Sequence, residues 1–77
     1  MIDDRKLRQV LSDVFEVPIE QIDETTMPAN LEKWDSLHHI KLVLALEDEF
    51  GVKFKEKEFL ELQSFKLIRL MLNEKLG

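Results

Sequence analysis

The residues best suited to chemistry form a short run near the middle of the chain, Trp34-Asp35-Ser36-Leu37. A serine in the first turn of a helix presents its hydroxyl to solvent. The free backbone N–H groups and the dipole of a helix N-terminus favour a phosphate there. A phosphodiester on Ser36 would therefore be well placed. Taken alone, the run also has a simpler interpretation, in which Asp35 or Ser36 is only the N-cap of a helix.

Two histidines follow directly, His38 and His39. Adjacent residues on a helix point about 100° apart, so the two rings cannot bind one metal ion together, and we predict no metal site. We expect His38 on a solvent-exposed strip and His39 partly buried against the bundle. A hydrolase is disfavoured, because Ser36 lies in no Gly-x-Ser-x-Gly elbow and no acid is arranged with either histidine. We assign no catalytic residue and expect a protein that is not an enzyme.

The periodicity of apolar residues indicates the elements that position this run. Apolar side chains recur at spacings of three and four over Asp4–Phe15, which predicts an amphipathic helix capped by Asp3 or Asp4. A long loop from Glu16 to Asp35 follows, and its scattered apolar residues indicate that it is pinned to the bundle. Trp34, the only tryptophan, is expected to pack the end of this loop against the bundle, with its indole N–H on a carbonyl oxygen.

A second helix is predicted from Asp35 or Ser36 to about Phe50, with Gly51 as its left-handed C-cap. Its apolar residues cover well over half of the circumference, so we expect it to be mostly buried, with one narrow solvated strip. A short third helix is predicted over residues 55–60, and a fourth helix, capped by Ser64, over residues 65–75. The predicted fold class is all-α: a small four-helix bundle with a short third helix and a long loop between the first two.

Composition narrows the function. The 77 residues suffice for one domain, residues 1–77, and the absence of cysteine excludes disulfides and thiolate sites. A formal charge of −5 disfavours nucleic acid and anionic membranes and suits basic protein partners. No apolar run approaches the roughly 20 residues of a membrane span, and the charged N-terminus is unlike a signal peptide. We therefore expect a cytoplasmic monomer.

The stretch from Asp35 to Gly51 closely resembles the phosphopantetheine-bearing helix of acyl carrier proteins. It begins with Asp-Ser-Leu, and residues 42–47 match the family's Leu-Val-x-Ala-Leu-Glu core residue for residue. The resemblance implies that a phosphopantetheinyl transferase attaches 4'-phosphopantetheine, donated by coenzyme A, to Ser36, with Asp35 and Leu37 beside it. Acyl groups would then be carried as thioesters on the thiol of the arm. Enzymes that transfer and modify acyl groups would supply the catalysis.

The resemblance also implies that these enzymes dock on the second helix, where Leu37 and Leu44 border the polar strip. For Leu44, a place in the core is the alternative. The docking surface is completed by His38, Lys41, Glu47 and Asp48. Carriers of primary fatty acid synthesis commonly have acidic residues where this chain has His38, His39 and Lys41, which would attract basic partners less. We therefore predict a specialised carrier of the fatty acid or polyketide type.

Two further interpretations stay open. A helical protein-interaction module would have the same composition and no prosthetic group. Peptidyl carriers have Gly-Gly-x-Ser where this chain has Trp34-Asp35, which favours an acyl carrier. A D-alanyl carrier shares the Asp-Ser pair, so an aminoacyl or peptidyl carrier is the alternative within the superfamily.

Overall fold

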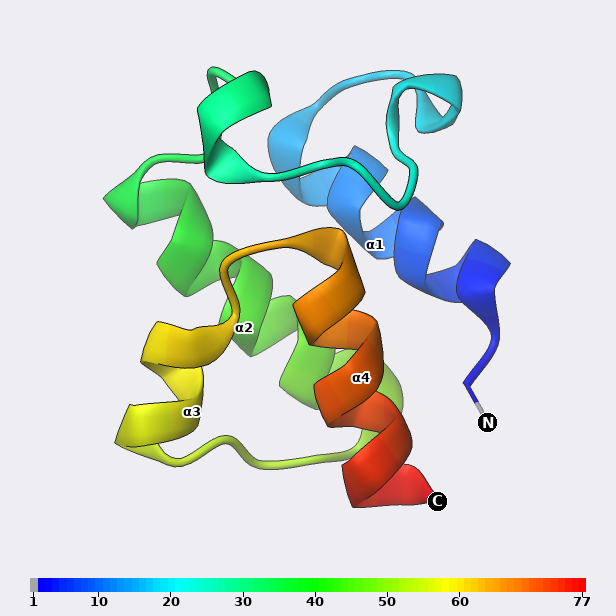
Figure 1. The fold of residues 1–77 in the computed structure, drawn as a ribbon, viewed down its shortest axis with the longest axis vertical. Coiled ribbons are helices and arrows are strands. Elements are labelled where there is room, and N and C mark those ends of the chain that lie inside the picture. The colour runs from blue at the N-terminus through cyan, green and yellow to red at the C-terminus, as the bar shows by residue number, and fades with distance from the viewer. Residues whose placement is uncertain (1) are drawn as a thin grey trace.

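The computed structural model describes residues 2–77, which form four helices and no strand. Helix α1 spans Asp4–Phe15, α2 spans Ser36–Phe50, α3 spans Glu56–Glu61 and α4 spans Phe65–Leu76 (Figure 1). Every predicted helix is confirmed to within one residue, as is the all-α fold class. None of these helices is long and apolar enough to cross a membrane.

Side-chain caps explain where the helices begin. The side chain of Asp3 accepts hydrogen bonds from two backbone N–H groups of α1, and Asp35 does the same for one N–H group of α2. Ser64 Oγ accepts from Leu67 N at 3.1 Å, which starts α4. Gly51, at φ 65°, ends α2 in the left-handed conformation that glycine adopts without strain. The caps fix the helix limits through bonds within a few residues of each end.

The core lies between α1, α2 and α4. Each of these helices places a stripe of aliphatic or aromatic side chains against the others. The largest side chains that are shielded completely from solvent are Leu7, Leu11, Phe15, Ile22, Leu42, Leu46, Leu62, Phe65, Ile68 and Leu72. The two ends of the described chain lie on the same side of the bundle (Figure 1), where Ile2 N donates to Asn73 Oδ1 at 2.8 Å.

The long loop between α1 and α2 is pinned, as predicted. It contains two short 3₁₀ turns, η1 over Ile19–Gln21 and η2 over Pro28–Asn30. Ile22 and Trp34 insert into the core with 1% and 6% of their surfaces exposed. The backbone of the loop is tied to α4, because Phe65 N donates to Thr26 O at 2.9 Å. The end of the loop therefore has a fixed position when it reaches α2.

The prediction that α2 is mostly buried is wrong. Leu37, Ile40 and Leu44 are 59%, 47% and 60% exposed. The buried residues form a separate stripe: His39, Leu42, Val43 and Leu46. The prediction treated all apolar residues of α2 as one buried face and so did not separate the buried stripe from the exposed one. The neighbouring helix α3 has only six residues, and it leaves the outer stripe uncovered.

The contrast between buried and exposed leucines can be tested with Leu11→Ala and Leu70→Ala, two identical changes within helices. Leu11 is 0% exposed and Leu70 is 56% exposed. We expect Leu11→Ala to lower the free energy of unfolding by about 2–5 kcal/mol, because it leaves a cavity in the core. Leu70→Ala should change it by less than about 0.5 kcal/mol. Urea unfolding followed by far-UV circular dichroism measures both, and equal losses would contradict the packing described.

Candidate functional site

Ser36 is the first residue of α2, and its side chain is exposed. It is not the N-cap. Asp35 has that role, because its Oδ1 accepts a hydrogen bond from His38 N at 2.8 Å. The Ser36 hydroxyl is therefore not needed to cap α2, and it lies at the positive end of the helix dipole.

Asp35 makes a second bond with the same neighbour. Its Oδ1 also lies 2.8 Å from His38 Nδ1, which must carry a proton to donate to a carboxylate. The backbone N–H of His38, and then its ring, stabilise the charged form and lower the pKa of Asp35 below its ordinary value of 3.8. The His38 side chain is only 20% exposed, and its ring centre lies 6.1 Å from that of Phe15. His38 was expected on the solvated strip, but these contacts turn it back over the helix start.

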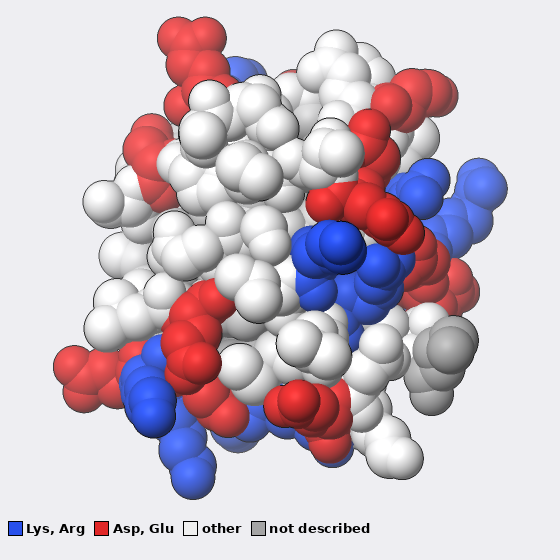
Figure 2. Space-filling model, viewed as in Figure 1, with Lys and Arg blue, Asp and Glu red and all other residues white. Residues whose placement is uncertain are grey.

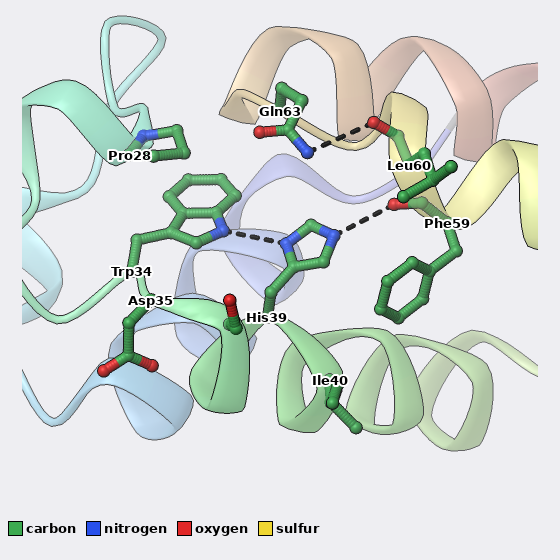
Figure 3. Close-up of a pocket in the computed structure, with 9 residues that line it drawn as sticks. Pro28, Trp34, Asp35, His39, Ile40, Phe59, Leu60 and Gln63 are labelled. Atoms are coloured by element: carbon green, nitrogen blue, oxygen red, sulfur yellow. Dashed lines mark hydrogen bonds between the residues drawn. The ribbon is translucent and has the colours of Figure 1, made fainter.

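Three groups form a row beside Ser36, and we call this row the histidine bridge: the indole of Trp34, the ring of His39 and the carbonyl of Phe59 (Figure 3). Trp34 Nε1 lies 2.9 Å from His39 Nδ1, and His39 Nε2 lies 2.9 Å from Phe59 O. An indole N–H can only donate and a carbonyl oxygen can only accept. His39 is therefore neutral in this arrangement, with its proton on Nε2.

The histidine bridge bears out two predictions and corrects a third. His39 is buried, at 8% exposed, and Trp34 packs the end of the loop against the bundle, as expected. The partner of the indole N–H is His39 and not a carbonyl oxygen. The first turn of α2 brings the ring of His39 under the loop end, where its unprotonated nitrogen is available as an acceptor.

A cleft of about 460 Å³ opens next to these residues, between the loop end, α2 and α3 (Figure 3). Its walls are mainly aromatic and aliphatic, with a few polar groups, which is the usual composition of a small-molecule site. It is lined by Pro28, Trp34, Asp35, Ser36, His39, Ile40, Phe59, Leu60 and Gln63. The sequence did not single out Leu60 and Gln63, which line the α3 side of this cleft, because the position of α3 depends on tertiary packing.

The side chains predicted to dock partners differ in their availability. Leu37 and Leu44 are exposed, so the core alternative for Leu44 is wrong. Lys41 and Asp48 are also exposed. Glu47 is only partly available, because its Oε2 accepts a hydrogen bond from Phe54 N at 2.8 Å and so holds the link between α2 and α3. The 3,4 spacing of residues 37, 40 and 44 was the signal for an outer stripe.

Charge is unevenly distributed over the surface. Figure 2 shows acidic side chains scattered around the edge of one face and a broad area without charged residues within it. Leu60 of α3, 66% exposed, continues the exposed apolar residues of α2. Among residues 2–77, no three His, Cys, Asp or Glu side chains gather to hold a metal ion.

The fold and this site together define a class: a small helical bundle with an exposed serine at the start of a helix, beside an apolar cleft. A family described as "Phosphopantetheine attachment site" matches residues 5–72, and the chain belongs to this family. It is therefore a member of the acyl carrier protein group that uses a phosphopantetheine prosthetic group. Family membership argues against an interaction module without a prosthetic group.

Two curated proteins illustrate the relationship. The chain is 36% identical over 53 residues to "Acyl carrier protein" of Lactobacillus acidophilus, a match that covers 69% of this chain and 66% of that protein. It is 29% identical over 77 residues to "Polyketide-8 synthase acyl carrier protein 2" of Streptomyces avermitilis, which covers 99% of this chain and 87% of that protein.

The residues at the start of α2 fit such a group. The site offers an exposed hydroxyl, a helix N-terminus that favours a phosphate, and a cleft with apolar walls that begins at the same serine. Asp35 contributes a negative charge nearby, but its Oδ1 is turned toward two donors of His38. The repulsion between this carboxylate and a phosphate is thereby reduced.

The bonds of Asp35 give a pH prediction. Because its folded-state pKa is lowered, the stabilisation by the carboxylate is complete above the ordinary value of 3.8 and is lost as the pH falls through the lower folded value. We expect an NMR titration of the Asp35 carboxyl to have its midpoint below 3.8. In His38→Ala the midpoint should rise but stay below that value, because the backbone bond remains. A native midpoint at or above the ordinary value would contradict the described bonds.

Proposed function

We propose that Ser36 carries the 4'-phosphopantetheine arm and that the chain is an acyl carrier protein, with no catalytic activity of its own. The observation that carries this proposal is the division of labour at the start of α2, where Asp35 caps the helix and leaves the exposed Ser36 hydroxyl available. When attached, the arm supplies a terminal thiol that holds acyl groups as thioesters.

The other serines support this choice. The sequence contains only Ser12, Ser36 and Ser64. Ser12 Oγ donates to Val17 O at 2.6 Å, and Ser64 Oγ caps α4. Both hydroxyls thus have structural roles at helix ends, and neither lies beside the cleft. Ser36 combines exposure, a helix N-terminus and an adjacent apolar cleft.

Partner enzymes are proposed to dock on the outer stripe of α2, next to the attachment point. Leu37, Ile40 and Leu44 form an exposed apolar contact, and the phosphopantetheinyl transferase and acyl-handling enzymes would cover it. Lys41, His38 and Asp48 provide polar groups at its edge, where charge affects the rate of association most. Glu47 contributes less, because Phe54 N occupies one of its oxygens.

The charges on this stripe support a specialised carrier of the fatty acid or polyketide type. Lys41 lies exposed between the apolar residues, and His38 donates to Asp35, so the stripe close to Ser36 is only weakly acidic. A partner with an arginine- and lysine-rich surface, suited to a strongly acidic carrier, would associate more slowly with it. An aminoacyl or peptidyl cargo is the alternative, because the Asp35-Ser36 pair does not distinguish it.

The attachment site is tested by intact-mass measurement after incubation with coenzyme A, magnesium and a phosphopantetheinyl transferase of broad specificity. We expect the native chain to gain one phosphopantetheine and Ser36→Ala to gain none. Ser64→Ala is the matched control and should be loaded like the native chain.

Loading of Ser36→Ala would refute the assignment of the site. Absence of loading on the native chain would call for a transferase from the same source, and failure with that enzyme too would refute the carrier proposal.

The role of charge is tested by Lys41→Glu, with Lys66→Glu on α4 as a matched control, since both lysines are exposed. We expect Lys41→Glu to raise the rate at which a housekeeping fatty acid synthase transfers malonyl groups to the holo protein, by about 3- to 10-fold at low ionic strength. Lys66→Glu should have a much smaller effect. The proposal of a specialised carrier fails if the native holo protein already reacts as fast as that system's own carrier.

A further inference from the structure

The histidine bridge joins three segments of the chain, and Trp34, His39 and Phe59 all line the cleft. Trp34 belongs to the loop end, His39 to α2 and Phe59 to α3 (Figure 3). Both ring nitrogens of His39 are used, at 2.9 Å each, and the ring meets that of Phe59 edge-on with centres 4.9 Å apart. A flip of the His39 ring would put carbon atoms where its two nitrogens lie and would break both bonds, so the bonds hold the ring in this orientation.

The buried stripe of α2 begins at His39. Leu42 and Leu46 follow at spacings of three and seven residues, on the same face of the helix. On the opposing segment, Leu62 lies three residues after Phe59, and Leu42, Leu46 and Leu62 are all 0% exposed. An apolar chain that passed from the cleft into the core between α2 and α3 would therefore meet the histidine bridge first.

We propose that the histidine bridge closes the core of this carrier to its cargo and makes His39 a specificity-determining residue. The inference rests on the proposed attachment at Ser36. Cargo is then restricted to the open outer cleft of about 460 Å³ beside Ser36. Longer apolar chains stay outside the core and are left more exposed to water, because they cannot be buried between α2 and α3.

The physical reason is the nature of the bonds that must break. Separating α3 from α2 would leave His39 Nε2 and the Phe59 carbonyl buried without partners, which is unfavourable in a way that parting two aliphatic side chains is not. Only a cargo long enough to extend into the core would have to break the His39–Phe59 bond.

The test uses butanoyl- and dodecanoyl-coenzyme A as donors, so that the transferase installs either chain on the native protein and on His39→Leu. Intact mass first reports whether loading occurs. NMR then follows the methyl signals of Leu46 and Leu62, and also the indole N–H signal, which is unique because Trp34 is the only tryptophan. These signals report on the core and on the bridge without any enzyme assay.

In the native protein we expect neither chain to move the Leu46 and Leu62 signals from their positions in the holo form. In His39→Leu, dodecanoyl should move them and butanoyl should not. Hydrogen exchange of the indole N–H should be at least about tenfold faster in this variant, because the acceptor is gone. His39→Gln, whose amide offers both an acceptor and a donor, should restore the native behaviour.

Two variants keep the test decisive. Leu70→Ala changes an exposed residue of α4 outside the docking stripe and the bridge, and should leave the indole signal in place. If circular dichroism shows that His39→Leu does not fold, His39→Met, which also makes neither bond of the bridge, is measured in its place.

The inference is overturned if dodecanoyl moves the core signals of the native protein, or if it moves them in neither the native protein nor the bridge variants. Absence of loading on the native chain would overturn the Ser36 assignment, and this inference with it.

Discussion

The carboxylate of Asp35 accepts the N–H group of His38, which has no acceptor within the helix, and this bond sets the residue at which α2 begins. The cap places Ser36 at the end of the helix, next to the cleft, and His39 in the first turn, where its ring lies beside Trp34. The proposed attachment point and His39 both lie within four residues of this cap, which the ring of His38 reinforces.

The caps also explain why the sequence predicts so much of this fold. Asp3, Asp35, Ser64 and Gly51 act on the backbone within a few residues of themselves, so their effects can be recognised without a tertiary structure. The chain contains only two glycines and two prolines, so few residues interrupt the helical patterns. The helix limits were therefore predicted to within one residue, and the long loop between α1 and α2 was predicted as well.

Packing was harder to predict, for a definite reason. The burial of a residue on α2 depends on which faces its neighbours cover, and α3, at six residues, covers only part of one. The sequence shows that Leu37, Ile40 and Leu44 are apolar, but their exposure follows from the small size of α3. The Trp34–His39 bond could not be predicted from the sequence either. It forms only because Ile22 and Thr26 hold the 20-residue loop against the bundle.

A buried histidine is an unusual choice for the core of a small domain that has no disulfide to support it. An aliphatic residue would be buried without needing partners, but it would hold neither Trp34 nor α3 in a defined position. His39 does both, because its two nitrogens accept from one segment and donate to another. The polar contact thereby holds three segments that line the cleft in place, while the surrounding leucines supply the stability. The buried face of α2 thus has two roles: Leu42 and Leu46 hold the bundle together, and His39 in the first turn is proposed to separate that core from a group attached at Ser36.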